Sequence, residues 1–105
     1  MATFDRREEA FEQKFVHDEE MKFRAVARRN RKLGLWAARK MGLKDAEADA
    51  YALAVIDLDL TKPGSEEVFE KVRADLSRKG VSEPDHKIRH TMEDLLLEAI
   101  DELKG

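Results

Sequence analysis

Residues 3–41 contain no proline and a single glycine, Gly34, and this long stretch constrains the fold more than any other feature. It predicts helix up to Gly42, which is well placed as a left-handed cap at the helix C-terminus. One straight helix of this length would measure about 57 Å, whereas a compact chain near 100 residues has a radius of gyration of about 13 Å. Part of the stretch must therefore overhang, bend or detach from the domain.

The apolar pattern indicates where this happens. At helical spacing Phe4, Phe11 and Phe15 form one narrow stripe, and the continuation of that stripe is polar. A second apolar face begins at Val16, rotated by roughly a quarter turn from the stripe. Its members are Val16, Phe23, Val26, Ala27, Leu33, Gly34, Ala37, Ala38 and Met41. The change of face predicts a boundary near residues 16–20, with an N-terminal arm of residues 1–18 and a bundle domain of residues 19–105.

Three further helices follow in the bundle domain. Residues 45–61 open with acids and carry apolar side chains almost all the way round, so we expect this helix to be the most buried. Another helix starts at Ser65 and ends before Gly80, and a last one starts near Asp85 and runs almost to the C-terminus. The sequence therefore predicts an all-α fold, a four-helix bundle with an additional mobile or extended N-terminal helical arm.

One polar residue interrupts the second apolar face. Asn30 lies in the middle of that face, one turn before Gly34. A buried amide needs hydrogen-bond partners, and a glycine lets a second helix approach closely. We therefore expect Asn30 to be buried and bonded to a crossing helix.

Composition and motifs exclude several classes of protein. The chain has no cysteine, so disulfides and thiolate metal sites are impossible, and no apolar run approaches the 18 to 20 residues of a membrane span. Phosphate-binding, dinucleotide-binding and nucleophile-elbow motifs do not occur. The N-terminus carries acids and arginines where a signal peptide needs an apolar stretch. We expect a cytoplasmic protein that is not an enzyme, binds no cofactor and does not insert into a membrane.

A metal-dependent enzyme remains an alternative because of two histidines. His86 and His90 are four residues apart on the last helix, which is the spacing of paired zinc ligands. The glutamate of an HExxH motif is missing, so solvent-facing histidines and no metal site are expected.

Charge is segregated along the chain despite a net charge of −3. Residues 21–44 contain nine bases and no acid, while the segments before and after them are acidic. The outer face of this basic helix consists of Arg24, Arg28, Arg31, Lys32 and Arg39. Pairing with the acidic helices is the structural interpretation, and contact with phosphates is the functional one. Because the whole chain is acidic and Trp36 is the one stacking aromatic beside the basic run at residues 28–32, we expect no nucleic-acid partner.

The residues alone leave two interpretations of the phenylalanine stripe open. The stripe could dock on a partner, since the bundle has four helices without it. Alternatively, it could belong to a fifth helix that folds back and packs on its own bundle.

A resemblance to a known family bears on this choice. Residues 4–42, FDRREEAFEQKFVHDEEMKFRAVARRNRKLGLWAARKMG, closely resemble the zeta inhibitory subunit of bacterial F-type ATP synthases, and EADAY, VFEKVRADL and DHKIRHTM extend the match. The resemblance implies a mobile N-terminal segment that enters the catalytic interface of the synthase head, jams the rotor and blocks ATP hydrolysis. It also implies a protein that is monomeric when free and associated with the cytoplasmic face of the membrane-bound synthase.

Helix faces then suggest which side chains of the segment contact the partner. The expected apolar anchors are Phe4, Phe11 and Phe15. The expected polar contacts are Asp5, Arg6, Arg7, Glu8, Glu9, Glu12 and Lys14. Helix-in-groove recognition needs only a few such anchors.

Overall fold

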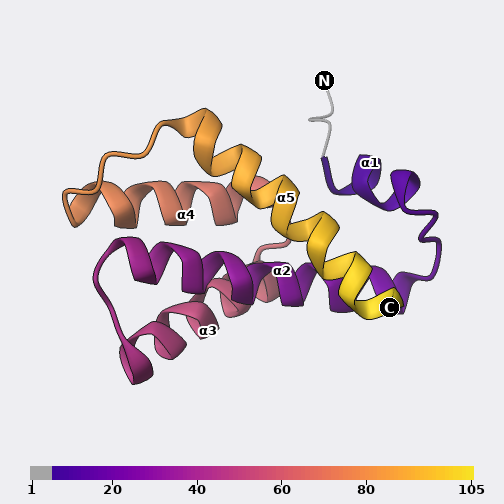
Figure 1. Cartoon of the computed structure of the whole chain (residues 1–105), viewed down its shortest axis with the longest axis horizontal. Coiled ribbons are helices and arrows are strands. Elements are labelled where there is room, and N and C mark those ends of the chain that lie inside the picture. Colours follow the sequence, from indigo (N-terminus) through magenta and orange to yellow (C-terminus); the bar gives the residue numbers. More distant parts are fainter. Residues whose placement is uncertain (1–5) are drawn as a thin grey trace.

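The computed structural model describes residues 6–105, with side chains from residue 7 onward, and all of its regular structure in that range is helical. The five helices (Figure 1) are α1 (Arg6–Gln13), α2 (Glu19–Lys40), α3 (Asp45–Thr61), α4 (Ser65–Arg78) and α5 (Asp85–Lys104). Among the described residues, none of these helices has the length and apolar character needed to cross a membrane.

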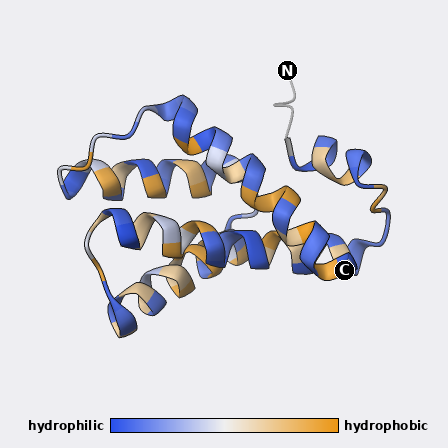
Figure 2. Cartoon of the chain, in the orientation of Figure 1, coloured by the Kyte–Doolittle hydropathy of each residue, from blue (hydrophilic) through white to orange (hydrophobic). Residues whose placement is uncertain are grey.

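Helix α2 is the centre of the bundle. It makes its most extensive contacts with α3 and α5, and α4 closes the bundle against α2, α3 and α5 (Figure 1). Hydrophobic and hydrophilic residues alternate along each helix (Figure 2), as expected when one face of a helix lies in the core and the other in solvent. The main core is built by α2 to α5 and contains Leu33, Ala37, Val55, Val68, Phe69, Val72, Leu76, Ile88 and Met92.

Local signals fix both ends of α2, at Asp18 and at Gly42. The Asp18 side chain accepts a hydrogen bond from the Glu20 amide, 3.0 Å away, and so caps the N-terminus of α2. Gly42 follows α2 with a φ of 79°, which confirms the left-handed cap.

Gly34 lets α2 and α3 approach closely. A Cβ atom at this position would lie 2.5 Å from the Cα atom of Ala52. No side chain fits at that distance, so the predicted close approach is confirmed and Ala52 of α3 is the residue it accommodates.

The prediction that residues 45–61 form the most buried helix is wrong. Helix α3 buries only Ala52, Val55 and Asp59, while Leu53 and Leu60 are 58% and 55% exposed. The apolar residues surround this helix, but it packs along one side, on α2 and α4. An apolar surface on all faces therefore did not indicate which face would be buried.

The described part of the arm, from residue 6 onward, is not extended. Helix α1 folds back beside the C-terminal half of α5 (Figure 1), so the expectation of an extended arm is corrected to a fifth packed helix. The break from α2 falls at residues 14–18, close to the predicted boundary. Burial of apolar side chains from α1, described next, provides the physical reason for folding back.

Candidate partner-binding segment

Helix α1 covers a second apolar cluster, separate from the main core. Phe11 is 3% exposed and is the largest side chain that α1 contributes. The cluster joins residues of α1 and the following turn to α2 and α5: Ala10, Phe11, Val16, Ala25, Leu96 and Ile100. Fully burying a phenylalanine stabilises by about 1.5–3 kcal/mol relative to exposing it, so this contact is a major attachment of α1.

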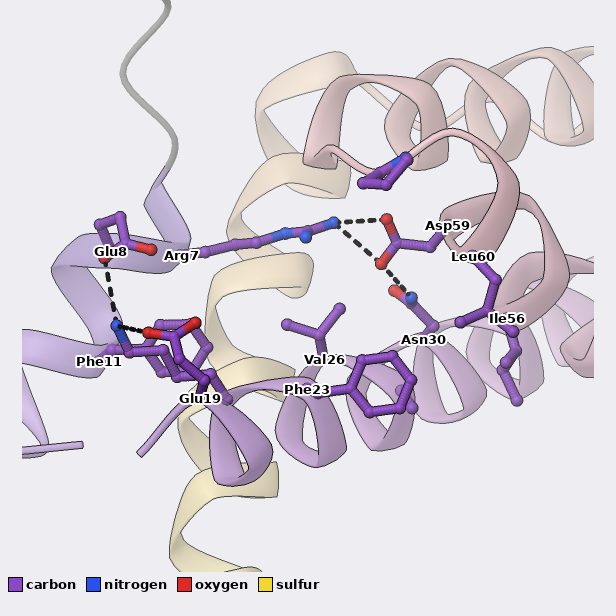
Figure 3. Close-up of a pocket in the computed structure, with 13 residues that line it drawn as sticks. Arg7, Glu8, Phe11, Glu19, Phe23, Val26, Asn30, Ile56, Asp59 and Leu60 are labelled. Carbon is purple, nitrogen blue, oxygen red and sulfur yellow. Dashed lines mark hydrogen bonds and ion pairs between the residues drawn. The ribbon is translucent and has the colours of Figure 1, made fainter. Parts of the chain in front are cut away.

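A buried polar cluster forms the other attachment. Nη2 of Arg7 donates to both carboxylate oxygens of Asp59, at 2.9 and 3.0 Å (Figure 3), and Nε donates to the hydroxyl of Ser65 at 2.9 Å. Asp59 is the last buried residue of α3, whereas Arg7 belongs to α1. The ion pair therefore ties the first helix to the end of the third.

Further hydrogen bonds hold Asp59 in place. It accepts from Nδ2 of Asn30 at 2.8 Å (Figure 3) and from the amide of Gly64 at 3.0 Å. Nε of Arg29 in turn donates to Oδ1 of Asn30 at 2.8 Å. The predicted bond from buried Asn30 to a crossing helix is thus confirmed. We call this network of Arg7, Asp59, Asn30, Arg29 and Gly64 the Arg7 clamp.

The surroundings of Asp59 shift its acidity. Burial pushes the pKa of Asp59 up, but the hydrogen bonds from Arg7, Asn30 and the Gly64 amide, together with the charge of Arg7, outweigh burial and bring the pKa below its usual 3.8. The clamp thus favours a charged carboxylate.

Docking of α1 is expected to weaken under acid conditions. Because the pKa of Asp59 is lower in the folded state, its charge stabilises the docked state above pH 3.8, and this stability is lost as pH falls through the lowered value. NMR exchange of the α1 amides across this range measures the effect, with α4 amides as the internal reference. Protection of α1 that is constant well below pH 3.8 would contradict it.

Weaker contacts surround these two attachments. Lys14 pairs with Asp101 of α5 at 3.0 Å, and Lys22 of α2 pairs with Glu8 at 3.6 Å. Nζ of Lys22 also lies 5.5 Å from the centre of the Phe11 ring, and Nζ of Lys104 donates to the carbonyl of Lys14. Exposed ion pairs contribute about 0–1 kcal/mol each, so Phe11 and the clamp dominate the attachment.

Phe15 occupies an unusual position at the end of α1. The amide of Val16 donates to the carbonyl of Phe11 at 2.8 Å and that of Phe15 to Glu12 at 3.1 Å, which is the Schellman pattern. Phe15 takes the left-handed position of this motif, with a φ of 58°, where glycine is usual. Its ring is 79% exposed. A bulky residue in this conformation costs about 1–2 kcal/mol, so the joint between α1 and α2 is strained.

The structure separates the predicted anchors. Phe11 points into the protein and Phe15 points out of it, while Phe4, Asp5 and the side chain of Arg6 lie outside the described residues. Arg7 and Lys14 bond within the chain. The remaining predicted polar contacts, Glu8, Glu9 and Glu12, are exposed. Thus the described stripe is not one continuous surface in this conformation.

The predicted basic surface is largely paired with acids of the same chain. Arg28 lies 2.6 Å from Glu102, and Lys32 lies 2.6 Å from Glu98 and 2.8 Å from Glu102, so both bind α5. Arg24 pairs with Glu20 one turn earlier in α2, whereas Arg31 and Arg39 are exposed. The structural interpretation of the charge blocks, pairing between helices, is confirmed for Arg28 and Lys32.

The two histidines lie on the surface. His86 and His90 are both exposed, and Nε2 of His90 lies 3.4 Å from Asp94. Within residues 6–105 as described, no group of three or more acidic or histidine side chains could hold a metal ion.

An open cleft lies beside the clamp, between α1, α2 and α3 (Figure 3). Arg7, Asn30 and Asp59 line its polar part, while Phe23, Ile56 and Leu60 line its apolar part. Phe23, predicted to lie on the core face of its helix, is instead 60% exposed, because it lies at this open cleft and in neither apolar cluster.

The sequence did not predict the burial of two residues of the clamp. Arg29 is 2% exposed although it lay on the polar continuation of the phenylalanine stripe, and Asp59 is 7% exposed. A single signal pointed to Asp59, namely an acid among apolar residues late in a helix. Its partner is 52 positions away, so no local pattern could identify Arg7.

A compact bundle with a short, separately attached N-terminal helix defines a small all-α protein. A family model described as ATPase inhibitor subunit zeta matches residues 1–102. The chain therefore belongs to the ATPase inhibitor subunit zeta family, which consists of inhibitor subunits and not of enzymes.

A solved structure and a sequence search complete the comparison. A protein structure determined by solution NMR is 39% identical in sequence, covers 80% of this chain and 95% of its own, and superposes with a TM-score of 0.70. A search of curated proteins finds no match.

Proposed function

We propose that this chain inhibits ATP hydrolysis by F-type ATP synthase, and that residues 1–18 are the segment that acts. The segment enters the catalytic interface of the synthase head and blocks rotation. Membership of the zeta family over residues 1–102 is the observation that carries this proposal. The remaining helices, residues 19–105, form the domain that carries the segment.

The contacts of α1 support this division into an inhibitory segment and a bundle domain. The main core consists of residues from α2 to α5 and includes none from α1. Helix α1 spans only eight residues, too few for a helix to be stable on its own, and its strongest attachments are the Phe11 ring and the Arg7–Asp59 ion pair. Such an element can leave the bundle without unfolding it.

Two classes of side chain on the segment suit a protein groove. Phe15 already presents an exposed ring, and Phe11 becomes available when α1 detaches. Aromatic anchors dominate helix-in-groove binding energies, while Glu8, Glu9 and Glu12 supply polar contacts at the rim. We place the inhibitor at the cytoplasmic face of the membrane-bound synthase, with a monomer as its free form.

The basic outer face of α2 is less suited to a polyanion than the sequence suggested. Arg28 and Lys32 are neutralised by Glu98 and Glu102 of α5, and binding phosphates would require breaking those pairs. We therefore do not propose nucleic acid as the partner.

Purified chain is expected to inhibit ATP hydrolysis by purified synthase from the same cell. Inhibition should saturate near one chain per catalytic head, because a blocked rotor stops all catalytic sites at once. A coupled ATPase assay measures this, with an unrelated acidic helical bundle of similar size as control. An ATP hydrolysis rate that stays unchanged in excess chain, together with a failure of chain and synthase to co-purify, would refute the proposal.

A further inference from the structure

The docked position of α1 occupies side chains that the proposed function requires. Phe11 is buried against α5, Arg7 is bound to Asp59, and Lys14 is bound to Asp101. A groove on a partner cannot contact Phe11 or Arg7 in this arrangement. Binding through them therefore requires α1 to leave its dock first.

We propose that this structure is an autoinhibited state of the inhibitor, and that the Arg7 clamp controls how often α1 is released. This inference rests on the proposed function and concerns the regulation of the same segment. The fraction of molecules with α1 released sets the apparent affinity for the synthase, because the docked form cannot bind through its buried anchors.

The clamp differs from the surface ion pairs of this chain. The side chains of Arg7 and Asp59 are 14% and 7% exposed, so water screens their attraction poorly. Asp59 accepts from Arg7, Asn30 and Gly64, and Ser65 accepts a further bond from Arg7. Release of α1 removes the cation and leaves the carboxylate beside Asn30. The free-energy cost of releasing α1 is therefore concentrated at Asp59.

The joint at Phe15 acts in the opposite direction. Its left-handed backbone is strained only while α1 is folded back through this turn. Residues 14–18 contain neither glycine nor proline, so the sequence does not favour the sharp break. The Arg7 clamp favours docked α1, and the strained joint favours released α1. Single substitutions at either place should therefore shift the equilibrium between the two states.

Replacing Asp59 by asparagine tests the role of the clamp. Asp59→Asn keeps the shape of the side chain but removes the charge that attracts Arg7. In the free protein, the α1 amides should exchange at least tenfold faster, as measured by NMR. Asp57→Asn is the matched control, because Asp57 is exposed on the same helix and outside the clamp, and it should leave exchange unchanged. Unchanged α1 exchange in Asp59→Asn would overturn the inference.

The same variants separate this inference from the proposed function. If wild-type chain inhibits and Asp59→Asn inhibits severalfold faster, autoinhibition is supported. If wild-type chain inhibits but Asp59→Asn, with α1 released, inhibits no faster, autoinhibition is refuted and the proposed function stands. If wild-type chain does not inhibit at all, the proposed function fails and the autoinhibition built on it falls as well.

A cross-link tests the inference without altering the clamp. Lys14 directly follows α1 and pairs with Asp101 of α5. The chain has no cysteine of its own. In the Lys14→Cys, Asp101→Cys protein, a short bis-thiosulfonate linker, which forms a disulfide with each cysteine and releases sulfinate, would hold α1 in its dock until it is reduced. The linked protein should lose inhibition at least tenfold and regain it on reduction, so the reduced protein is its own control. Equal inhibition before and after reduction would overturn autoinhibition.

Discussion

Deletion of residues 1–17 is expected to abolish inhibition of ATP hydrolysis while the four bundle helices remain folded. The main core lies among α2 to α5 and keeps all its members. Cutting after His17 also preserves Asp18, whose side chain caps α2. The deletion removes every proposed anchor at once, so the loss of inhibition should be complete.

The truncated bundle should nevertheless be less stable than the full chain. Leu96 and Ile100 lose the cover of Phe11, and Asp59 loses Arg7. Loss of this apolar burial and of the cation lowers the melting temperature, measured by circular dichroism at 222 nm. A variant that lacks residues 1–5 is the matched control for the melting temperature, since it retains α1 and both attachments. Full inhibition by the chain that lacks residues 1–17 would refute the role of the segment.

The sequence predicts the bundle well because its signals are local. Gly42 ends α2 through its left-handed backbone, and α4 and α5 begin at Ser65 and Asp85, directly after the turns at Gly64 and Pro84. Asn30 and Gly34 were identified for a related reason, since each violates an otherwise apolar face and needs a specific neighbour. The structure supplies those neighbours as Asp59 and Ala52.

What the sequence could not predict depends on distant contacts. Burial of Phe11 requires a surface formed by α2 and α5, and the phenylalanine stripe reads the same whether that surface or a partner covers it. The Arg7 clamp joins residues from α1, α2 and α3. Helix α3 gave a misleading signal, because apolar residues on all sides do not indicate which side will be covered.

The contrast between Phe11 and Phe15 separates docking on the bundle from docking on the partner. Phe11→Ala removes a buried ring, which costs about 3–5 kcal/mol in a core, so α1 should lose its protection from hydrogen exchange. Phe15→Ala removes an exposed ring and should leave α1 protection unchanged. Hydrogen exchange followed by NMR measures both effects in the free protein.

Inhibition assays should give a different ranking of the two variants. Phe15→Ala should weaken inhibition by about 2 kcal/mol, roughly 30-fold, since loss of an aromatic anchor acts on the complex alone. Phe11→Ala loses an anchor but also frees α1 from its dock, so its two effects oppose each other and the net loss should be smaller. Phe23→Ala, on the exposed surface of α2 outside the segment, is the control and should inhibit like the wild type. If Phe15→Ala inhibits as strongly as this control, Phe15 is not an anchor, and its strained, exposed position must have another cause.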